Sequence, residues 1–382
     1  PLPFFMEKVK DNIAPRAEGI ILFPQPGKGV VNGKQIHRTF PVNPTQPITA
    51  WGLIGAGIRA YDYMDGVGNR YGVHTVILEV DGEEVFRSVV DRFAYEENRY
   101  INSWTHGQYM KSFIEPGNRL RMLHASNGNR GLVEINEERP YRFVYTLSDA
   151  LGNTSKVRFT VQGKNTEIHP VEHREKYAFK WDRTNYLQEP GLELVVPRGM
   201  LYDDVWLDYS VRADSGDVAF TYQLHNKRVP LHGACEMRIG LRRDRLEDKS
   251  KYYVAGVTAR GGKYSIGGTY EDGFMKVRIR DLGTYTVAVD TVPPEIIPLN
   301  PGQWGRTGRI TLKAKDKETG INSYRGTIDG KYALFGKPNS ISGNLVCELD
   351  PKHVKKGGRH TVEMTVTDGR GNRTTEEFHF VW

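Results

Sequence analysis

The sequence predicts an all-β protein made of three β-sandwich domains in tandem, and three observations support this prediction. The 382 residues are too many for one core, so two or three domains are expected. The 41 Gly, 20 Pro and 20 Tyr are typical of short strands joined by tight turns rather than of long helices. Finally, a set of short motifs occurs twice in the same order, which indicates a duplicated module.

The duplicated motifs mark the beginning and the end of each module. Each module begins with an aspartate four residues before a proline that starts an extended run, at Asp11 and at Asp290. Each ends with an Asp-x-x-Gly-Asn turn, at 149–153 and at 368–372, followed by alternating strand residues. Aspartate, glycine and asparagine are the residues that tight turns select, so we interpret both endings as structural turns.

The middle of each module also repeats, because an Asp-Gly pair lies at an expected hairpin tip at 81–82 and again at 329–330. We therefore expect Ig-like or fibronectin-like sandwiches at 11–162 and 290–382. Residues 1–10 are expected to be a tether from a preceding domain.

Strands are expected where apolar residues run together or alternate. In the first module these are 19–23, 48–61 and 74–80, and in the last module 309–315 and 324–328. The segment 163–289 has no copy of the repeated motifs, yet it alternates at 192–196, 205–211, 276–280 and 283–289. We expect it to be a β-sandwich of another type.

The first module carries a long insertion, at about 86–140, that is rich in aromatic residues. One interpretation is a recognition loop that presents Trp104, His106 and Tyr109 to a ligand. The alternative is a satellite core packed beneath an extended loop. These three residues are the candidate binding residues of the chain.

The formal charge of +7 is spread along the chain among 46 acidic residues, which argues against a nucleic-acid groove. Cys235 and Cys347 fall in different domains, so we expect buried apolar thiols rather than an intradomain disulfide. No apolar run is long enough for a transmembrane segment, and no signal peptide opens the chain. The apolar beginning without methionine reads like the middle of a longer protein.

The sequence contains none of the common catalytic motifs. The eleven histidines include no H-E-x-x-H or H-x-H spacing, and His169 and His173 lie beside a proline at an expected domain junction. No Gly-x-Ser-x-Gly elbow or Cys-His pair indicates a nucleophile. We predict no catalytic residue in this chain.

Two acidic turns, 62–66 and 316–320, place oxygen ligands at alternate positions, as some calcium-stabilised sandwich modules do. Neither turn alone supplies the six or more oxygens that calcium requires. Asx-turns account for the same residues, so no metal ligand and no cofactor is assigned from the sequence.

Four segments of the chain carry a family resemblance. They are the segment at 1–15, the Arg-Tyr-Ile-Asn-Ser stretch at 99–103, the Gly-Asn-Arg-Leu stretch at 117–120 and the Asp149 turn. They resemble the region that follows the catalytic domain in lysostaphin/LytM-type zinc metallopeptidases, the peptidoglycan endopeptidases of one group of Gram-negative bacteria. The family's zinc ligands, a His-x3-Asp pair and a His-x-His histidine, have no counterpart in these 382 residues. Zinc is therefore implied only for a peptidase domain that this chain lacks.

The resemblance implies a non-catalytic accessory region of an exported protein of the periplasm or cell envelope. Such a region would position or regulate the zinc peptidase domain. Its expected partners are peptidoglycan or an envelope protein and its own peptidase domain, with no nucleic acid. The alternative hypothesis is a stand-alone glycan- or protein-binding surface module, and an enzyme acting by itself is a third.

Overall fold

A computed structural model describes residues 11–213, 218–339 and 342–382, so the tether predicted at 1–10 lies outside the described residues. Strands make up 52% of the described residues and helices 5%, which confirms the all-β prediction. The chain packs as two compact units. The first contains the residues up to Arg174 with Ala178–Arg183 and Arg198–Trp206, and the second contains the remainder. The predicted boundaries between three domains stay a prediction.

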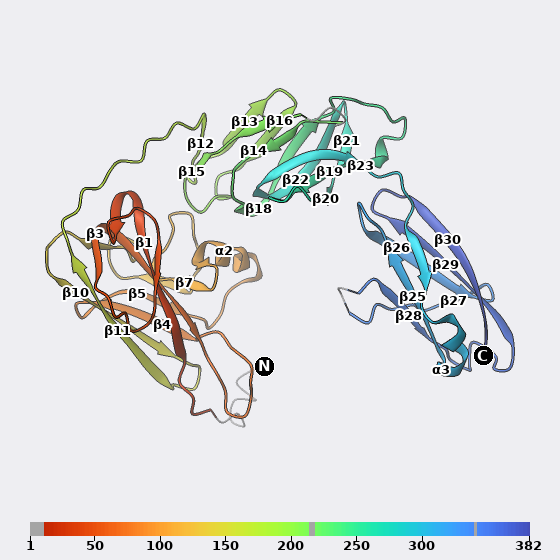
Figure 1. The fold of residues 1–382 in the computed structure, drawn as a ribbon, viewed down its shortest axis with the longest axis horizontal. Helices are drawn as coiled ribbons and strands as arrows, with labels where there is room; N and C mark the ends of the chain where they lie inside the picture. Colours follow the sequence, from red (N-terminus) through yellow and green to blue (C-terminus); the bar gives the residue numbers. More distant parts are fainter. Residues whose placement is uncertain (1–10, 214–217, 340–341) are drawn as a thin grey trace. The chain divides into compact units, whose positions relative to one another are not determined.

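The first module is an eleven-stranded sheet (Figure 1). Its strands are β1 (Arg16–Val31), β2 (Arg38–Phe40), β3 (Ile48–Tyr61), β4 (Thr75–Val80), β5 (Glu83–Val89), β6 (Thr105–His106), β7 (Tyr109–Lys111), β8 (Leu123–Ala125), β9 (Val133–Ile135), β10 (Pro140–Ser148) and β11 (Thr154–Gly163). The main order is β2-β1-β3-β11-β10-β4-β5-β8, and β7 and β9 pair with β3. The end of β11 pairs in parallel with the beginning of β3, so the β1–β3 layer and the β10–β4 layer are continuous.

One apolar core lies between these layers, because alternate residues of each strand point inward. In β10, for example, Tyr141, Phe143 and Tyr145 are buried while their neighbours are more exposed. The predicted insertion begins inside β5 and then forms η1 (Tyr95–Tyr100), α2 (Ile101–Trp104) and β6–β9. It adds Trp104 and Leu120 to the core, so it is part of the module rather than a free loop.

The middle domain consists of two five-stranded sheets with orders β13-β14-β18-β22-β21 and β16-β17-β23-β19-β20. Their strands are β13 (Asn185–Glu189), β14 (Leu192–Val196), β16 (Ser210–Arg212), β17 (Thr221–Gln223), β18 (Val229–Gly240), β19 (Tyr252–Val257), β20 (Lys263–Gly267), β21 (Thr269–Glu271), β22 (Phe274–Leu282) and β23 (Thr284–Val289), with η2 (Lys249–Lys251) before β19. A separate two-stranded ribbon joins β12 (Tyr177–Phe179) and β15 (Val205–Leu207).

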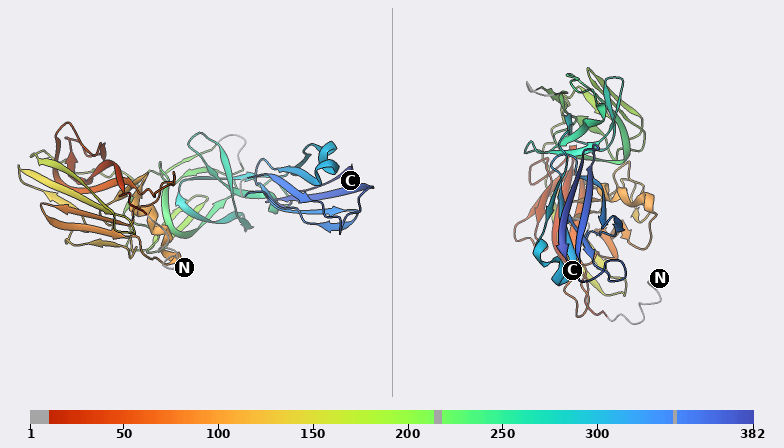
Figure 2. Two further views of the ribbon diagram at one scale, coloured as in Figure 1. Left: turned by 90° about the horizontal axis from the view of Figure 1, so that it is seen from below. Right: turned by 90° about the vertical axis from the view of Figure 1, so that its right-hand side faces the viewer.

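The third module packs a three-stranded sheet, β24-β25-β28, against a four-stranded sheet, β27-β26-β29-β30 (Figures 1 and 2). Its elements are β24 (Glu295–Pro298), η3 (Pro301–Gln303), α3 (Trp304–Thr307), β25 (Arg309–Lys315), β26 (Ile321–Ile328), β27 (Lys331–Ala333), β28 (Asn344–Glu348), β29 (Arg359–Asp368) and β30 (Arg373–Val381). Its four-stranded sheet has the order that β5-β4-β10-β11 has in the first module. The repeated motifs therefore correspond to a repeated topology.

Two further expectations are confirmed by burial and backbone geometry. Cys235 and Cys347 are both free and buried, as expected of apolar thiols. The Asp-Gly pairs join β4 to β5 and β26 to β27, and both aspartates, Asp81 and Asp329, have positive φ. That conformation is the one a two-residue hairpin turn requires.

Candidate functional site

The turn between β10 and β11 holds the segment that leads into the first module. The Asp149 carboxylate accepts hydrogen bonds from the backbone N–H groups of Leu151 and Asn153, at 2.8 and 2.9 Å. The Asn153 side-chain amide donates to Asp149 Oδ2 at 2.6 Å and to the Asp11 carbonyl at 3.0 Å. One asparagine thus joins two segments that are far apart in the sequence.

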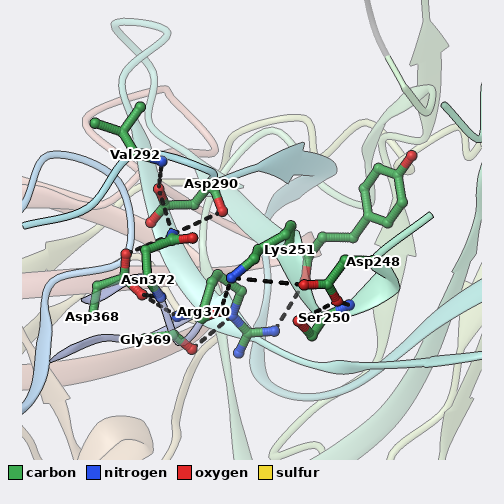
Figure 3. Close-up of polar contacts among 10 residues, drawn as sticks. Asp248, Ser250, Lys251, Asp290, Val292, Asp368, Gly369, Arg370 and Asn372 are labelled. Atoms are coloured by element: carbon green, nitrogen blue, oxygen red, sulfur yellow. Dashed lines mark hydrogen bonds and ion pairs between the residues drawn. The ribbon is translucent and has the colours of Figure 1, made fainter. Parts of the chain in front are cut away.

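The turn between β29 and β30 repeats this arrangement in the third module. The Asp368 carboxylate accepts from the N–H groups of Arg370 and Asn372, at 2.8 and 2.9 Å. The Asn372 amide donates to Asp368 Oδ2 at 2.7 Å and to the Asp290 carbonyl at 3.1 Å. Figure 3 shows Asn372 lying between the two aspartates. We call each set, Asp11–Asp149–Asn153 and Asp290–Asp368–Asn372, an Asp–Asn clasp.

A hydroxyl two residues after each clasp asparagine strengthens the same connection. Ser155 Oγ donates to the Pro15 carbonyl at 2.5 Å, and Thr374 Oγ1 donates to the Pro294 carbonyl at 2.5 Å. These prolines end the repeated Asp-x-x-x-Pro motif. The spacing of that motif therefore places both the aspartate and the proline carbonyl against the last hairpin of the module.

A third aspartate joins each clasp from the end of the strand that pairs with the first strand of its module, β3 in the first module and β25 in the third. Carboxylate oxygens of Asp11, Asp62 and Asp149 lie within 4.8 Å of one another. The equivalent oxygens in the third module belong to Asp290, Asp316 and Asp368. Two aspartates of each trio are buried and the third is half-buried. Over residues 11–213, 218–339 and 342–382, no ion pair involves any of these six carboxylates.

The two trios differ in how the strand-end carboxylate is satisfied. Asp316 Oδ2 accepts three backbone N–H groups, from Glu318, Thr319 and Gly320, at 3.1, 2.8 and 2.7 Å. In the first module, Asp62 Oδ1 is buried and has no hydrogen-bond partner among the described residues. Burial raises the pKa of Asp62, and the negative charges of Asp149 and Asp11 raise it further.

The clasp turn of the third module also binds the middle domain, within the second compact unit. Arg370 Nη1 donates to the carbonyls of Tyr252 and Gly268, at 3.0 Å each. Lys251 Nζ donates to the Arg370 carbonyl at 3.0 Å (Figure 3), and Tyr253 donates to Glu318 Oε2 at 2.8 Å. The turn therefore has two roles, since its Asn372 side chain closes the third module and its Arg370 side chain holds a neighbouring sheet.

The three candidate binding residues occupy different environments. Trp104 is only 7% exposed, and its indole N–H donates to the Lys111 carbonyl at 3.0 Å. His106 is exposed in β6 with its ring 4.6 Å from that of His37, and Tyr109 is half-buried in β7. Burial favours the packing interpretation for Trp104. A ligand-binding role for the three residues stays a prediction.

The two histidines considered as a metal pair belong to neither aspartate trio of the described residues. His169 Nδ1 is 3.5 Å from a Glu167 carboxylate oxygen, in an exposed position. His173 stacks on Trp206 with ring centroids 3.6 Å apart and an interplanar angle of 8°. The sequence did reveal all six aspartates as repeated positions, but each turn considered alone gave too few ligands to suggest a shared site.

Comparison with known proteins gives a match for one part of the chain. Residues 176–290 match the Zu5-like domain family, and no curated protein matches the chain. No helix among the described residues has the length and apolar character needed to cross a membrane.

Among solved structures the chain is similar to several β-rich proteins. One is the Bacteroides ovatus mixed-linkage glucan utilization locus SGBP-B in complex with a mixed-linkage heptasaccharide, at 11% identity, covering 97% of this chain and 71% of that one, with a TM-score of 0.14. A 1.5-MDa bacterial ice-binding adhesin is 9% identical, with 86% and 90% covered and a TM-score of 0.15. A tetra-tandem repeat from the extending region of a large adhesion protein is 10% identical, with 97% and 92% covered and a TM-score of 0.19. With TM-scores this low, neither the domain arrangement nor the ligands of these proteins are transferred to this chain.

Replacing Asn372 by alanine tests the clasp of the third module. The change removes the donor shared by the Asp290 carbonyl and Asp368, and leaves buried acceptors unpaired. We expect a loss of about 2 kcal/mol in the stability of that module, measured by denaturant unfolding. Asn322→Ala, an exposed strand position of the same module, is the matched control. Equal stability of the two variants would contradict the account.

Replacing Arg370 by alanine tests the contact with the middle domain. The variant retains the backbone N–H that Asp368 binds, so the third module should stay folded while its hold on the middle domain weakens. We expect faster protease cleavage near residues 290–294, with the unfolding of the third module unchanged. Arg373→Ala, on the adjoining strand, should not change cleavage. Cleavage of Arg370→Ala at the parent rate would exclude the proposed role.

Proposed function

We propose that this chain is a non-catalytic accessory region of an exported cell-envelope protein, and that it positions or regulates a zinc peptidoglycan endopeptidase domain. The observation that carries the proposal is the double role of the Asp368 turn, which closes the third module and holds the middle domain through Arg370. A region that must hold another domain at a fixed place benefits from such connections, because they limit the freedom of its own modules.

Two further points support the accessory role. The resemblance at 99–103 and 117–120 is to the accessory region of LytM-type peptidases, and the zinc ligands of that family have no counterpart in this sequence. In the described residues, the clusters of metal-binding side chains are the two aspartate trios, which contain no histidine or cysteine. Trios of this kind are unsuited to catalytic zinc, which takes nitrogen or sulfur ligands in most sites.

The proposal is tested by digestion of purified peptidoglycan in the presence of zinc. This chain is compared with the full protein that its native reading frame encodes. We expect only the longer protein to release fragments, and release by this chain alone would contradict the non-catalytic role. In the longer protein, Arg370→Ala should slow the digestion of insoluble sacculi while leaving cleavage of a small soluble peptide unchanged. Arg373→Ala again serves as the control.

A second candidate function, a glycan- or protein-binding surface module, is favoured by a hollow on the middle domain. Its volume is about 560 Å³, and its lining includes His225, Arg228 and Tyr264. The Tyr264 ring covers Gly256 of the adjacent strand, and the Arg228 guanidinium lies 5.9 Å from the ring centroid. Burial lowers the pKa of His225, so its neutral ring is favoured, and its Nδ1 accepts from the backbone N–H of Asp208. An aromatic ring beside polar donors suits a sugar.

Calorimetric titration with soluble peptidoglycan fragments and with neutral oligosaccharides tests the second candidate. If the hollow binds sugar, Tyr264→Ala should weaken binding roughly two- to tenfold, since one stacked ring is worth about 0.5–1.5 kcal/mol. Tyr332→Ala, an exposed tyrosine of the third module, should have no effect. Absence of binding to every fragment would reject this function for the hollow.

A further inference from the structure

The first aspartate trio brings together three carboxylates from segments that are distant in the sequence. Asp11 lies before β1, Asp62 follows β3, and Asp149 begins the turn between β10 and β11. One oxygen of each carboxylate lies within 4.8 Å of the other two. The three side chains therefore converge on one small volume at one end of the module.

The charge in this volume is not balanced by the described side chains. None of the three carboxylates takes part in an ion pair in the described part of the chain. Asp62 is 8% exposed and Asp149 is 5% exposed, so solvent screens their charges poorly. Bringing like charges together in this way is unfavourable unless a cation or a proton compensates them.

A second and independent observation is the unsatisfied oxygen of Asp62. Its Oδ1 is buried and finds no donor among the described residues, whereas a buried carboxylate oxygen normally accepts at least one hydrogen bond. One oxygen of the Asp62 carboxylate belongs to the trio, so the orphan acceptor sits on a carboxylate that a cation bound among the three aspartates would use as a ligand.

The third module supplies an internal comparison. There, three backbone N–H groups occupy Asp316 Oδ2, and the Thr319 hydroxyl donates to Asp290 Oδ2 at 2.5 Å. The aspartate trio of the third module is thus largely satisfied by hydrogen bonds from the loop that follows Asp316. The longer loop after Asp62 instead runs to Tyr71, with which Asp62 forms a β-bridge, and leaves Oδ1 unpaired.

The chemistry of the ligands selects the ion. Three carboxylates without histidine or cysteine suit a hard cation rather than zinc. Ca²⁺ accepts six to eight oxygen ligands in flexible geometry, whereas Mg²⁺ demands a near-ideal octahedron and usually keeps several of its waters. Three carboxylates from separate segments therefore suit Ca²⁺ better, and half-buried Asp11 leaves a side on which water can complete the coordination.

We propose that Asp11, Asp62 and Asp149 bind one Ca²⁺, which fastens the leading segment of the first module to the end of β3 and to the β10–β11 turn. The ion supplies the positive charge that the side chains lack and gives Asp62 Oδ1 a partner. This inference does not depend on the proposed accessory function, because it concerns the closure of the module alone.

Isothermal titration calorimetry of the chelator-treated chain with CaCl₂ tests the proposal. We expect saturation at one equivalent, with a dissociation constant on the order of 0.1–1 mM, the range of extracellular calcium modules. Ca²⁺ should also raise the melting temperature of the first module, because the ion binds only the folded state. MgCl₂ at the same concentrations should have a smaller effect.

Two matched variants make the test specific. Asp62→Asn keeps the shape and removes one charge, and we expect calcium binding at least about tenfold weaker with the metal-free fold retained, since the loss of a buried unpaired charge does not destabilise the module. Asp316→Asn makes the same change in the third module and should leave calcium binding as in the parent. No saturable binding up to about 10 mM, well above the expected constant, would overturn the proposal. Unchanged binding by Asp62→Asn, or its loss in Asp316→Asn alone, would overturn it as well.

Discussion

The two hydrogen bonds donated by the side chain of the clasp asparagine are the interaction on which the rest of each module depends. The asparagine amide carries two N–H donors, and one buried Asn372 side chain satisfies both a carboxylate in the last hairpin and a carbonyl at the beginning of the module. A buried acceptor left without such a donor would cost about 1–3 kcal/mol. The leading segment is therefore fixed against the final turn, and the two ends of the module close on each other.

Closure of the module has consequences beyond its stability. Because the leading aspartate and the turn aspartate must both reach the asparagine, they come close to a third aspartate at the end of the neighbouring strand. The same turn also directs Arg370 outward, toward the carbonyls of Tyr252 and Gly268. The geometry of this one turn therefore both brings three aspartates together and anchors the third module to the middle domain.

Much of the fold follows from the sequence because the repeated motifs are turn residues with strict backbone requirements. The Asp-Gly pairs at 81–82 and 329–330 need positive φ, and they mark the hairpins where they were predicted. Local sequence does not decide whether Trp104 is exposed or packed, since its burial depends on contacts with distant strands. The aspartate trios were missed for the same reason. The carboxylates of each trio come from three separate segments, and the sequence alone does not show that these segments meet.

Hydrogen exchange of the turn amides tests the central claim most directly. The N–H groups of Asn153 and Asn372 donate to buried aspartates inside solvent-facing turns. If each clasp holds its module closed, the backbone N–H groups of Asn153 and Asn372 should exchange as slowly as those of the core strands β10 and β29. Exchange of both amides at the rate of an unprotected turn would show that the clasps open freely, and would contradict the account.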